Sequence, residues 1–104
     1  MLNAGDGTHE SVQVIDTSTS HVSQTIKYQP PEGVHAGLAL SPDGARAYAS
    51  GDGSEQIHVS SVSGGLTEDS PIKLPETNPA GLPVNMYPAG LAVTPDGTRL
   101  VVAD

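Results

Sequence analysis

Two segments of fifteen residues in this chain have nearly the same sequence, and this repetition constrains the fold more than any other feature. Residues 36–50 are AGLALSPDGARAYAS and residues 89–103 are AGLAVTPDGTRLVVA, so the phrase recurs 53 residues later. A weaker repetition relates AGDGTHESVQVID in residues 4–16 to SGDGSEQIHVSS in residues 50–61. Repeat periods of roughly 20 to 50 residues are typical of solenoids, propellers and arrays, whose units bury their apolar faces only against neighbouring units.

One repeat unit predicts four short β-strands and no helix. Within residues 36–74 the segments AGLAL, ARAYAS, IHVSSV and PIKL are separated by SPDG, GDGSEQ and SGGLTEDS. In the SPDG and TPDG segments, Pro presets φ, Asp suits the next turn position and Gly accepts a left-handed backbone, which favours tight hairpin turns. The predicted structural turn residues are Pro42, Asp43, Gly44, Pro95, Asp96 and Gly97. We therefore expect an all-β chain with antiparallel connections.

Four antiparallel strands in a unit of this length are typical of a β-propeller blade. Blades taper toward the propeller axis, so the small residues of AGLAL suit the innermost strand. Residues 1–104 are then one propeller segment of about two blades, one whole and one split between the termini. Residues 36–74 form the complete blade, residues 89–103 supply the first two strands of the split blade, and residues 1–28 supply its third and fourth. At the N-terminus, Met1 to Ala4 aligns with Leu100 to Ala103 as a remnant of a second strand.

The segments GLALSPDGARAYAS and GLAVTPDGTRLVVAD, with a VQVID-like strand nearby, resemble the YVTN-type repeats of YncE-like β-propellers. The segment YPAGLAVTPDGTRLVVAD is also similar to the propeller that precedes a phosphoesterase domain in some bacterial proteins. The resemblance implies a propeller fold and a periplasmic or extracellular location. The chain departs from the family in length, because a closed propeller of that kind has several more blades. It also departs in residues 78–87, NPAGLPVNMY, which lengthen the loop before an inner strand.

The net charge of the chain limits the classes of partner that we expect it to bind. Twelve Asp and Glu against four Lys and Arg give a formal net charge of -8, which disfavours binding to nucleic acid. No apolar run approaches the roughly 20 residues that span a bilayer, so no membrane insertion is predicted. The split blade predicts partners of another kind. These are further copies of the chain, paired strand to strand in a homo-oligomer, or other blades of a longer chain.

The sequence contains few residue patterns that are typical of catalytic or metal-binding sites. The four His residues, His9, His21, His35 and His58, lack metal-ligand spacing, and turn formation explains the two GDG segments, so no metal or cofactor is predicted. No GxSxG motif or triad order supports nucleophilic catalysis. His35 immediately precedes an inner strand, whose entry lies near the central channel of a propeller. His35, Asn85 and Tyr87 are thus a candidate ligand site at the channel mouth; the alternative is that they are ordinary loop residues.

These observations favour a non-catalytic β-propeller module that acts as a structural, ligand-binding or protein-interaction scaffold. The alternative is a fragment of a propeller enzyme or of an enzyme-associated propeller, either lactonase-like or the N-terminal part of a phosphoesterase. The enzymatic alternative requires metal-binding or acid-base residues beyond those found in this sequence.

Overall fold

Every element of regular structure in the computed structural model is a β-strand. The structure describes residues 1–3, 9–29, 33–51, 55–62, 64–75, 79–83 and 88–103. All the strand pairs in these ranges are antiparallel. The prediction of an all-β, antiparallel chain is therefore confirmed. No helix in the described ranges is long and apolar enough to cross a membrane.

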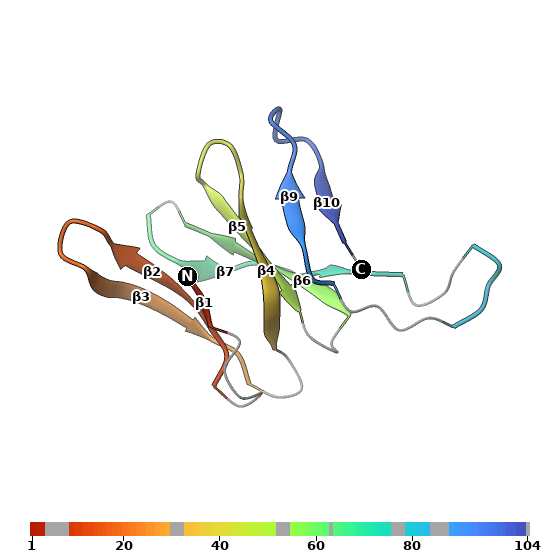
Figure 1. The fold of residues 1–104 in the computed structure, drawn as a ribbon, viewed down its shortest axis with the longest axis horizontal. Helices are drawn as coiled ribbons and strands as arrows, with labels where there is room; N and C mark the ends of the chain where they lie inside the picture. The colour runs from red at the N-terminus through yellow and green to blue at the C-terminus, as the bar shows by residue number, and fades with distance from the viewer. Residues whose placement is uncertain are drawn as a thin grey trace.

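The strands form three sheets that lie side by side, with the central sheet between the two smaller ones (Figure 1). The N-terminal sheet contains β1 (Leu2–Asn3), β2 (Ser11–Asp16) and β3 (His21–Lys27). The central sheet contains β4 (Val34–Leu40), β5 (Arg46–Gly51), β6 (Gln56–Ser61), β7 (Thr67–Glu68) and β8 (Ile72–Lys73). The C-terminal sheet contains β9 (Leu91–Val93) and β10 (Leu100–Val102). Strand β4 contacts both β1 and β9, and so joins the three sheets.

The central sheet has four strand positions, because β7 and β8 share the outer edge of β6. Strand β7 pairs with Ser60 and Ser61, whereas β8 pairs with Gln56 and Ile57. Between them the Asp69 amide donates to the Val59 carbonyl at 2.8 Å. The outer strand is thus one strand interrupted in the middle.

The hairpins β4–β5 and β9–β10 repeat each other in register. Leu38 lies opposite Ala49 in the first, and Leu91 lies opposite Val102 in the second, each 53 positions later. The N-terminal sheet repeats the outer half of the central sheet in the same way. Val12 of β2 pairs with Ile26 as Ile57 of β6 pairs with Ile72.

Strand β1 departs from the expected alignment by two residues. Leu2 lies opposite Val12, which corresponds to Ser50 opposite Ile57 in the central sheet. Leu2 therefore takes the place equivalent to Ala103, whereas the sequence comparison matched Met1 with Leu100. In sequence, the segment between β1 and β2 is longer than the segment between β5 and β6.

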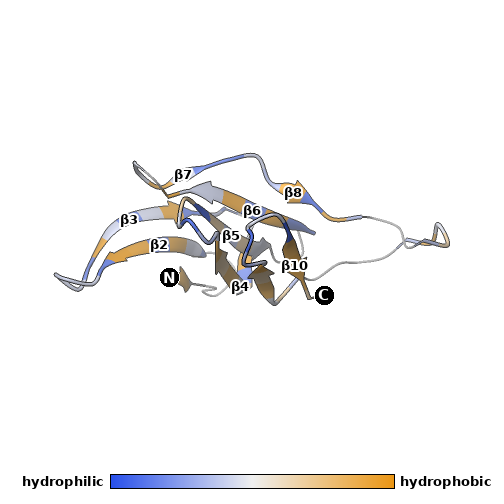
Figure 2. Ribbon diagram, turned by 90° about the horizontal axis from the view of Figure 1, so that it is seen from above, coloured by the Kyte–Doolittle hydropathy of each residue, from blue (hydrophilic) through white to orange (hydrophobic). Residues whose placement is uncertain are grey.

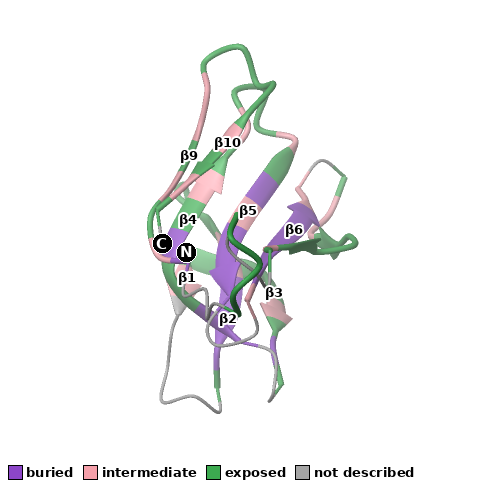
Figure 3. Ribbon diagram, turned by 90° about the vertical axis from the view of Figure 1, so that its right-hand side faces the viewer, coloured by how far each residue is buried: buried purple, intermediate pink, exposed green. Residues whose placement is uncertain are grey.

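The hydrophobic core lies between the N-terminal and central sheets. Val12, Tyr28, Val34 and Ala49 form a buried cluster against which Leu2 and Ile26 pack. Figure 2 shows hydrophobic residues gathered in strands such as β2 and β4, and Figure 3 shows the buried residues concentrated in β5 and β6. The core is small, because the chain contains no Phe or Trp.

The inner strand β4 begins at Val34, two residues before the expected start at Ala36. Val34 lies opposite Gly51, and the register then shifts before Leu38. The early start follows from a contact outside the sheet, because the Glu10 carboxylate accepts a hydrogen bond from the Val34 amide. His35 consequently lies inside a strand rather than in the loop before it.

Candidate functional site: a polar clamp between two sheets

The predicted turn residues close the two repeated hairpins. In β4–β5 the Ser41 amide donates to the Arg46 carbonyl at 2.9 Å, and the Gly44 amide donates to the Ser41 carbonyl at 2.9 Å. Gly44 has a φ of +72°, which a residue without Cβ adopts at little cost. Thr94, Arg99 and Gly97 repeat these bonds in β9–β10, where Gly97 has a φ of +73°. The second residues of the two turns, Pro42 and Pro95, are exposed.

The turn carboxylates bind their own turns. Asp43 accepts from the Ser41 hydroxyl at 2.6 Å and from the Ala45 amide at 3.0 Å. Asp96 accepts in the same way from the Thr94 hydroxyl and the Thr98 amide. The hydroxyl bond, followed by the amide bond, lowers the pKa of each Asp below its ordinary value. These carboxylates act as local turn ligands, and the hollow of about 200 Å³ between the two turns lies beside them.

The proposed channel-mouth residues are only partly described. His35 is exposed on β4, next to the buried Val34. Asn85 and Tyr87 lie outside the described residues. The ligand site at the channel mouth therefore stays a prediction.

A buried carboxylate that the sequence analysis did not single out lies where the N-terminal and central sheets meet. Glu10 precedes β2 and is 6% exposed. Its Oε2 accepts a hydrogen bond of 2.5 Å from the Val34 amide, at the start of β4. A Cβ on Gly33 would collide with this carboxylate, so a larger residue there would displace the Glu10 side chain from its present position. Glu10 thus ties the N-terminal sheet to the first residues of the inner strand.

His58 holds the other side of the same peptide group. It lies in β6, is 1% exposed, and its Nε2 is 2.9 Å from the Gly33 carbonyl oxygen. Because a carbonyl oxygen can only accept, Nε2 carries the proton in this bond. The C=O of Gly33 and the N–H of Val34 belong to one peptide bond, so Glu10 and His58 together hydrogen-bond both polar groups of that peptide. We call Glu10, Gly33, Val34 and His58 the polar clamp.

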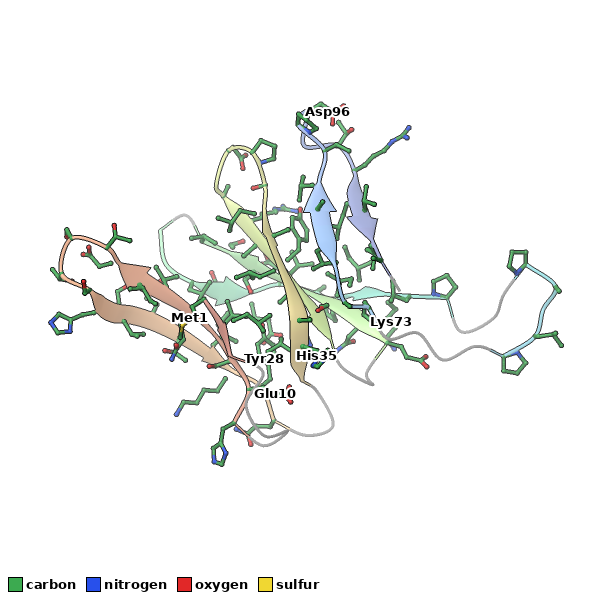
Figure 4. The ribbon with its side chains drawn as sticks, viewed as in Figure 1. Met1, Glu10, Tyr28, His35, Lys73 and Asp96 are labelled. Atoms are coloured by element: carbon green, nitrogen blue, oxygen red, sulfur yellow. The ribbon has the colours of Figure 1, made fainter. Side chains whose placement is uncertain are left out.

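Two further groups surround the His58 ring. The Tyr28 ring packs on it with a centroid distance of 4.4 Å and an angle of 48° between the ring planes. On the other side Nδ1 lies 3.4 Å from Oε1 of Glu68, which belongs to β7. Tyr28 is itself held in place by its amide, which donates to the Glu10 carbonyl at 3.0 Å. Figure 4 shows Glu10 and Tyr28 at the lower end of the junction between the two sheets.

The polar clamp fixes the position of the peptide between Gly33 and Val34. Buried polar groups that are left without hydrogen bonds cost about 1 to 3 kcal/mol each, and the clamp provides bonds for both polar atoms of one buried peptide. Within the described ranges no group of three His, Cys, Asp or Glu side chains is arranged to hold a metal ion. The chemistry of this arrangement is thus hydrogen bonding that fixes one sheet against another.

A polar hollow of about 270 Å³ opens on the outer side of the N-terminal sheet. Its lining includes Glu10 and Tyr28 from the junction, together with Gln13, Thr25 and Lys27 from β2 and β3. An apolar groove of about 220 Å³ lies on the opposite face, between β2 and the β4–β5 hairpin. The groove differs from the polar hollow in that residues of two sheets line it.

The apolar groove is bordered by half-exposed apolar side chains. Val12 and Val14 line it from β2, and Leu38 and Leu40 line it from β4. Leu38 is 36% exposed and Leu40 is 58% exposed, although both point toward the N-terminal sheet. Met1 occupies one end of the groove.

Sequence reasoning missed the clamp because its members are 24 and 25 positions apart in the chain. One sequence signal was present. Glu10 and Glu55 occupy the same position of the repeat, just before β2 and β6, and their carbonyls accept from the Tyr28 and Leu74 amides at 3.0 Å in each case. A carboxylate repeated at one position of two units is a sign of a recurring structural role.

Comparisons with known proteins give a fold likeness alone. No protein-family model and no curated protein matches the sequence. Among solved structures, the chain is similar to a chain of Kuenenia stuttgartiensis hydrazine synthase, with a TM-score of 0.67 and 24% sequence identity. The match covers 94% of this chain and 26% of the other, so this chain spans about a quarter of the length of the protein that it matches. The described strands thus adopt an arrangement that also occurs inside a much longer protein.

Proposed function

We propose that this chain is a blade-forming module of a β-propeller and acts as a non-catalytic scaffold for binding or protein interaction. Strands β4 to β8 are its complete blade, β9 and β10 are the inner half of another blade, and β1 to β3 are the outer half. In this proposal the chain is related to the YVTN-type repeats of YncE-like propellers. Its open sheets are completed by further strands, in a homo-oligomer or in a longer chain.

The observation that carries the proposal is the close stacking of the repeated inner strands. A Cβ built on Gly37 of β4 would overlap the Ala89 carbonyl oxygen and would lie 3.1 Å from Cγ of Leu91. Two strands of different sheets approach this closely only where one of them presents no side chain. Such contact between inner strands is what the taper of propeller blades toward their axis requires.

The polar clamp supports the same proposal from the other side of the central sheet. It bonds the first peptide of β4 to Glu10, which precedes the first long strand of the N-terminal sheet, and to His58 of the central sheet itself. In a propeller, such a contact would set the angle between consecutive blades. The scaffold would then present its loops at fixed positions for a ligand or partner.

Solution mass and hydrogen exchange of the purified 104-residue chain test this proposal. We expect a discrete species of about three or four chains that persists on dilution, since propellers typically have four to eight blades. We also expect the amides of β10 to be protected, because an added strand would bond them. A cooperatively folded monomer with unprotected β10 amides would overturn the proposal, since its sheets would then need no completion.

A further inference from the structure

We propose that the β9–β10 hairpin of a second copy pairs with the free part of the β2 edge and fills the apolar groove beside it. This inference rests on the proposed function and names the partner and the register. Four features of the structure bear on this pairing: the outer edge of β10, the edge of β2, the groove of about 220 Å³ and the short strand β1.

The central sheet provides the template for this pairing. Hairpin β4–β5 pairs through β5 with β6, with Tyr48 opposite Val59. Hairpin β9–β10 is the same structure 53 positions later, so Val101 of β10 corresponds to Tyr48. Strand β2 corresponds to β6 at the positions of Val12 and Ile57, so Val14 corresponds to Val59. The template therefore places Val101 of one copy opposite Val14 of another.

The hairpin presents a face that suits the groove. The residues on its outer face are small or aliphatic: Gly90, Ala92, Val101 and Ala103. Val101 is 59% exposed in the single chain. In the central sheet the equivalent Tyr48 lies against Val93 and Leu100 of the next sheet. Docked on β2, Val101 would lie against Leu40 and Ala47, the equivalents of Val93 and Leu100.

Charge complementarity supports the same register. Continuing the template by two residues places Arg99 opposite Asp16, as Arg46 lies opposite Ser61 within the central sheet. Asp16 is exposed at the end of β2, and a hydrogen bond from the Ser18 hydroxyl holds its pKa below the ordinary value, so it is ionised at neutral pH. Opposite charges facing each other across an antiparallel pair stabilise that pairing and disfavour shifted registers.

In the single chain, strand β1 occupies part of the β2 edge with which the hairpin of a second copy would pair. Leu2 pairs with Val12, the position that Ala103 of a second copy would take, and the Met1 carbonyl accepts from the Gln13 amide at 2.7 Å. Within the described residues, Ile15 and Asp16 of β2 carry no partner on this edge. The hairpin would pair first with this free part of the edge and would displace β1 to complete the register.

Disulfide cross-linking tests the register cleanly, because the natural chain contains no Cys. Two single variants, Val14→Cys and Val101→Cys, are mixed and oxidised. Residues opposite each other in an antiparallel pair have Cα atoms about 4.5 to 5.5 Å apart, within the range for a disulfide. We expect the mixed disulfide as the main product. In the control, Val102→Cys replaces Val101→Cys, and we expect little product because this neighbouring side chain points to the opposite face.

A charge variant provides a second measurement that does not depend on oxidation. Arg99→Glu should weaken self-association several-fold, because it places two acidic groups opposite each other. Arg46→Glu is the matched control, since Arg46 occupies the same hairpin position but faces Ser61 of its own chain. Equal effects of the two variants would overturn the register.

The outcomes separate this inference from the proposed function. A discrete assembly that forms the mixed disulfide supports both. A discrete assembly without the Val14–Val101 disulfide, or with equal product in the Val102→Cys control, overturns the register and leaves the scaffold proposal standing. A folded monomer with unprotected β10 amides overturns both.

Discussion

The two repeated hairpins have the same turns and the same register but very different surroundings. In β4–β5, Ala47 is 6% exposed and Ala49 is 3% exposed, because β6 lies beside them and the N-terminal sheet covers their face. In β9–β10 the matching positions are only partly buried, and Val101 is 59% exposed. The local chemistry of the turn thus determines the hairpin, whereas neighbouring sheets determine its burial.

The bases of the hairpins also differ in how they bond. Beyond the β9–β10 ladder, the Ala103 amide donates to the Gly90 carbonyl and the Ala103 carbonyl accepts from the Ala89 amide, each at 2.9 Å. In β4–β5 the register shifts, and the Ser50 hydroxyl accepts from the Gly37 amide at 2.8 Å. The bases of the two hairpins therefore differ in that a side-chain hydroxyl bonds the inner strand only in β4–β5 among the described residues. Four pairs of variants test how far the repeated positions are equivalent.

The largest expected effect is that of Gly37→Val against Gly90→Val. Gly37 has no room for a Cβ, because the Ala89 carbonyl is in its place, whereas a Cβ on Gly90 would meet only Cβ of Ala103 at an ordinary 3.4 Å. In the unassembled chain we expect Gly37→Val to lower the free energy of unfolding by about 3 kcal/mol and Gly90→Val to have a much smaller effect. Chemical denaturation measures both. Both glycines belong to the small-residue frame of the repeat, so sequence alone predicts equal costs, and equal costs would contradict the stacking of β4 on β9.

Removal of the buried carboxylate comes next, with Glu10→Ala set against Glu55→Ala. The first variant leaves the Val34 amide buried without its acceptor, which should lower the free energy of unfolding by about 1 to 3 kcal/mol. Glu55 occupies the equivalent repeat position but is more exposed, so its replacement should cost less. Thermal unfolding followed by circular dichroism would show the difference. If Glu55→Ala proved as costly as Glu10→Ala, the clamp would not be specific to the first junction.

A smaller effect is expected for Ser50→Ala, which copies into β5 the residue found at position 103. The variant removes the hydroxyl that accepts from the buried Gly37 amide, at a cost of about 1 kcal/mol. The reverse change, Ala103→Ser, should be nearly neutral because the Ala103 backbone already completes its ladder. Denaturation midpoints of the two variants compare them. A neutral Ser50→Ala would show that the Ser50 hydroxyl contributes no net stability through its bond to the Gly37 amide.

The smallest effect is the acid dependence that the turn carboxylates produce. Asp43 and Asp96 have lowered pKa values in the folded chain, so their stabilisation is fully present above the pKa of the unfolded chain. It is lost as the pH falls below about 4, through the folded-state values. Asp43→Asn and Asp96→Asn should each reduce this acid dependence slightly and to the same extent. Unfolding curves between neutral and acid pH measure the effect, and unequal changes would show that the turns are not equivalent.

Local chemistry explains which features the sequence predicts. The turns at Gly44 and Gly97 depend on a few neighbouring residues, so the hairpins and their common register follow from the repeat. The clamp depends on Glu10 meeting Val34, and that contact exists only once two sheets are in place. Strand β7 was predicted as loop, because Thr67 and Glu68 gain their strand geometry only from pairing with β6. The finer architecture therefore depends on contacts between units, which a single sequence does not display.

The interrupted outer strand gives the central sheet an edge that discourages unwanted growth. Strands β7 and β8 are two residues long each, and Pro71 between them has no amide hydrogen to offer a newcomer. Short edge strands and proline are among the devices by which natural sheets avoid templating fibrils. Chains of this kind would therefore add strands at one border of their sheets and resist adding them at the other. In the proposed assembly, that polarity would confine strand addition to the border that a second copy completes.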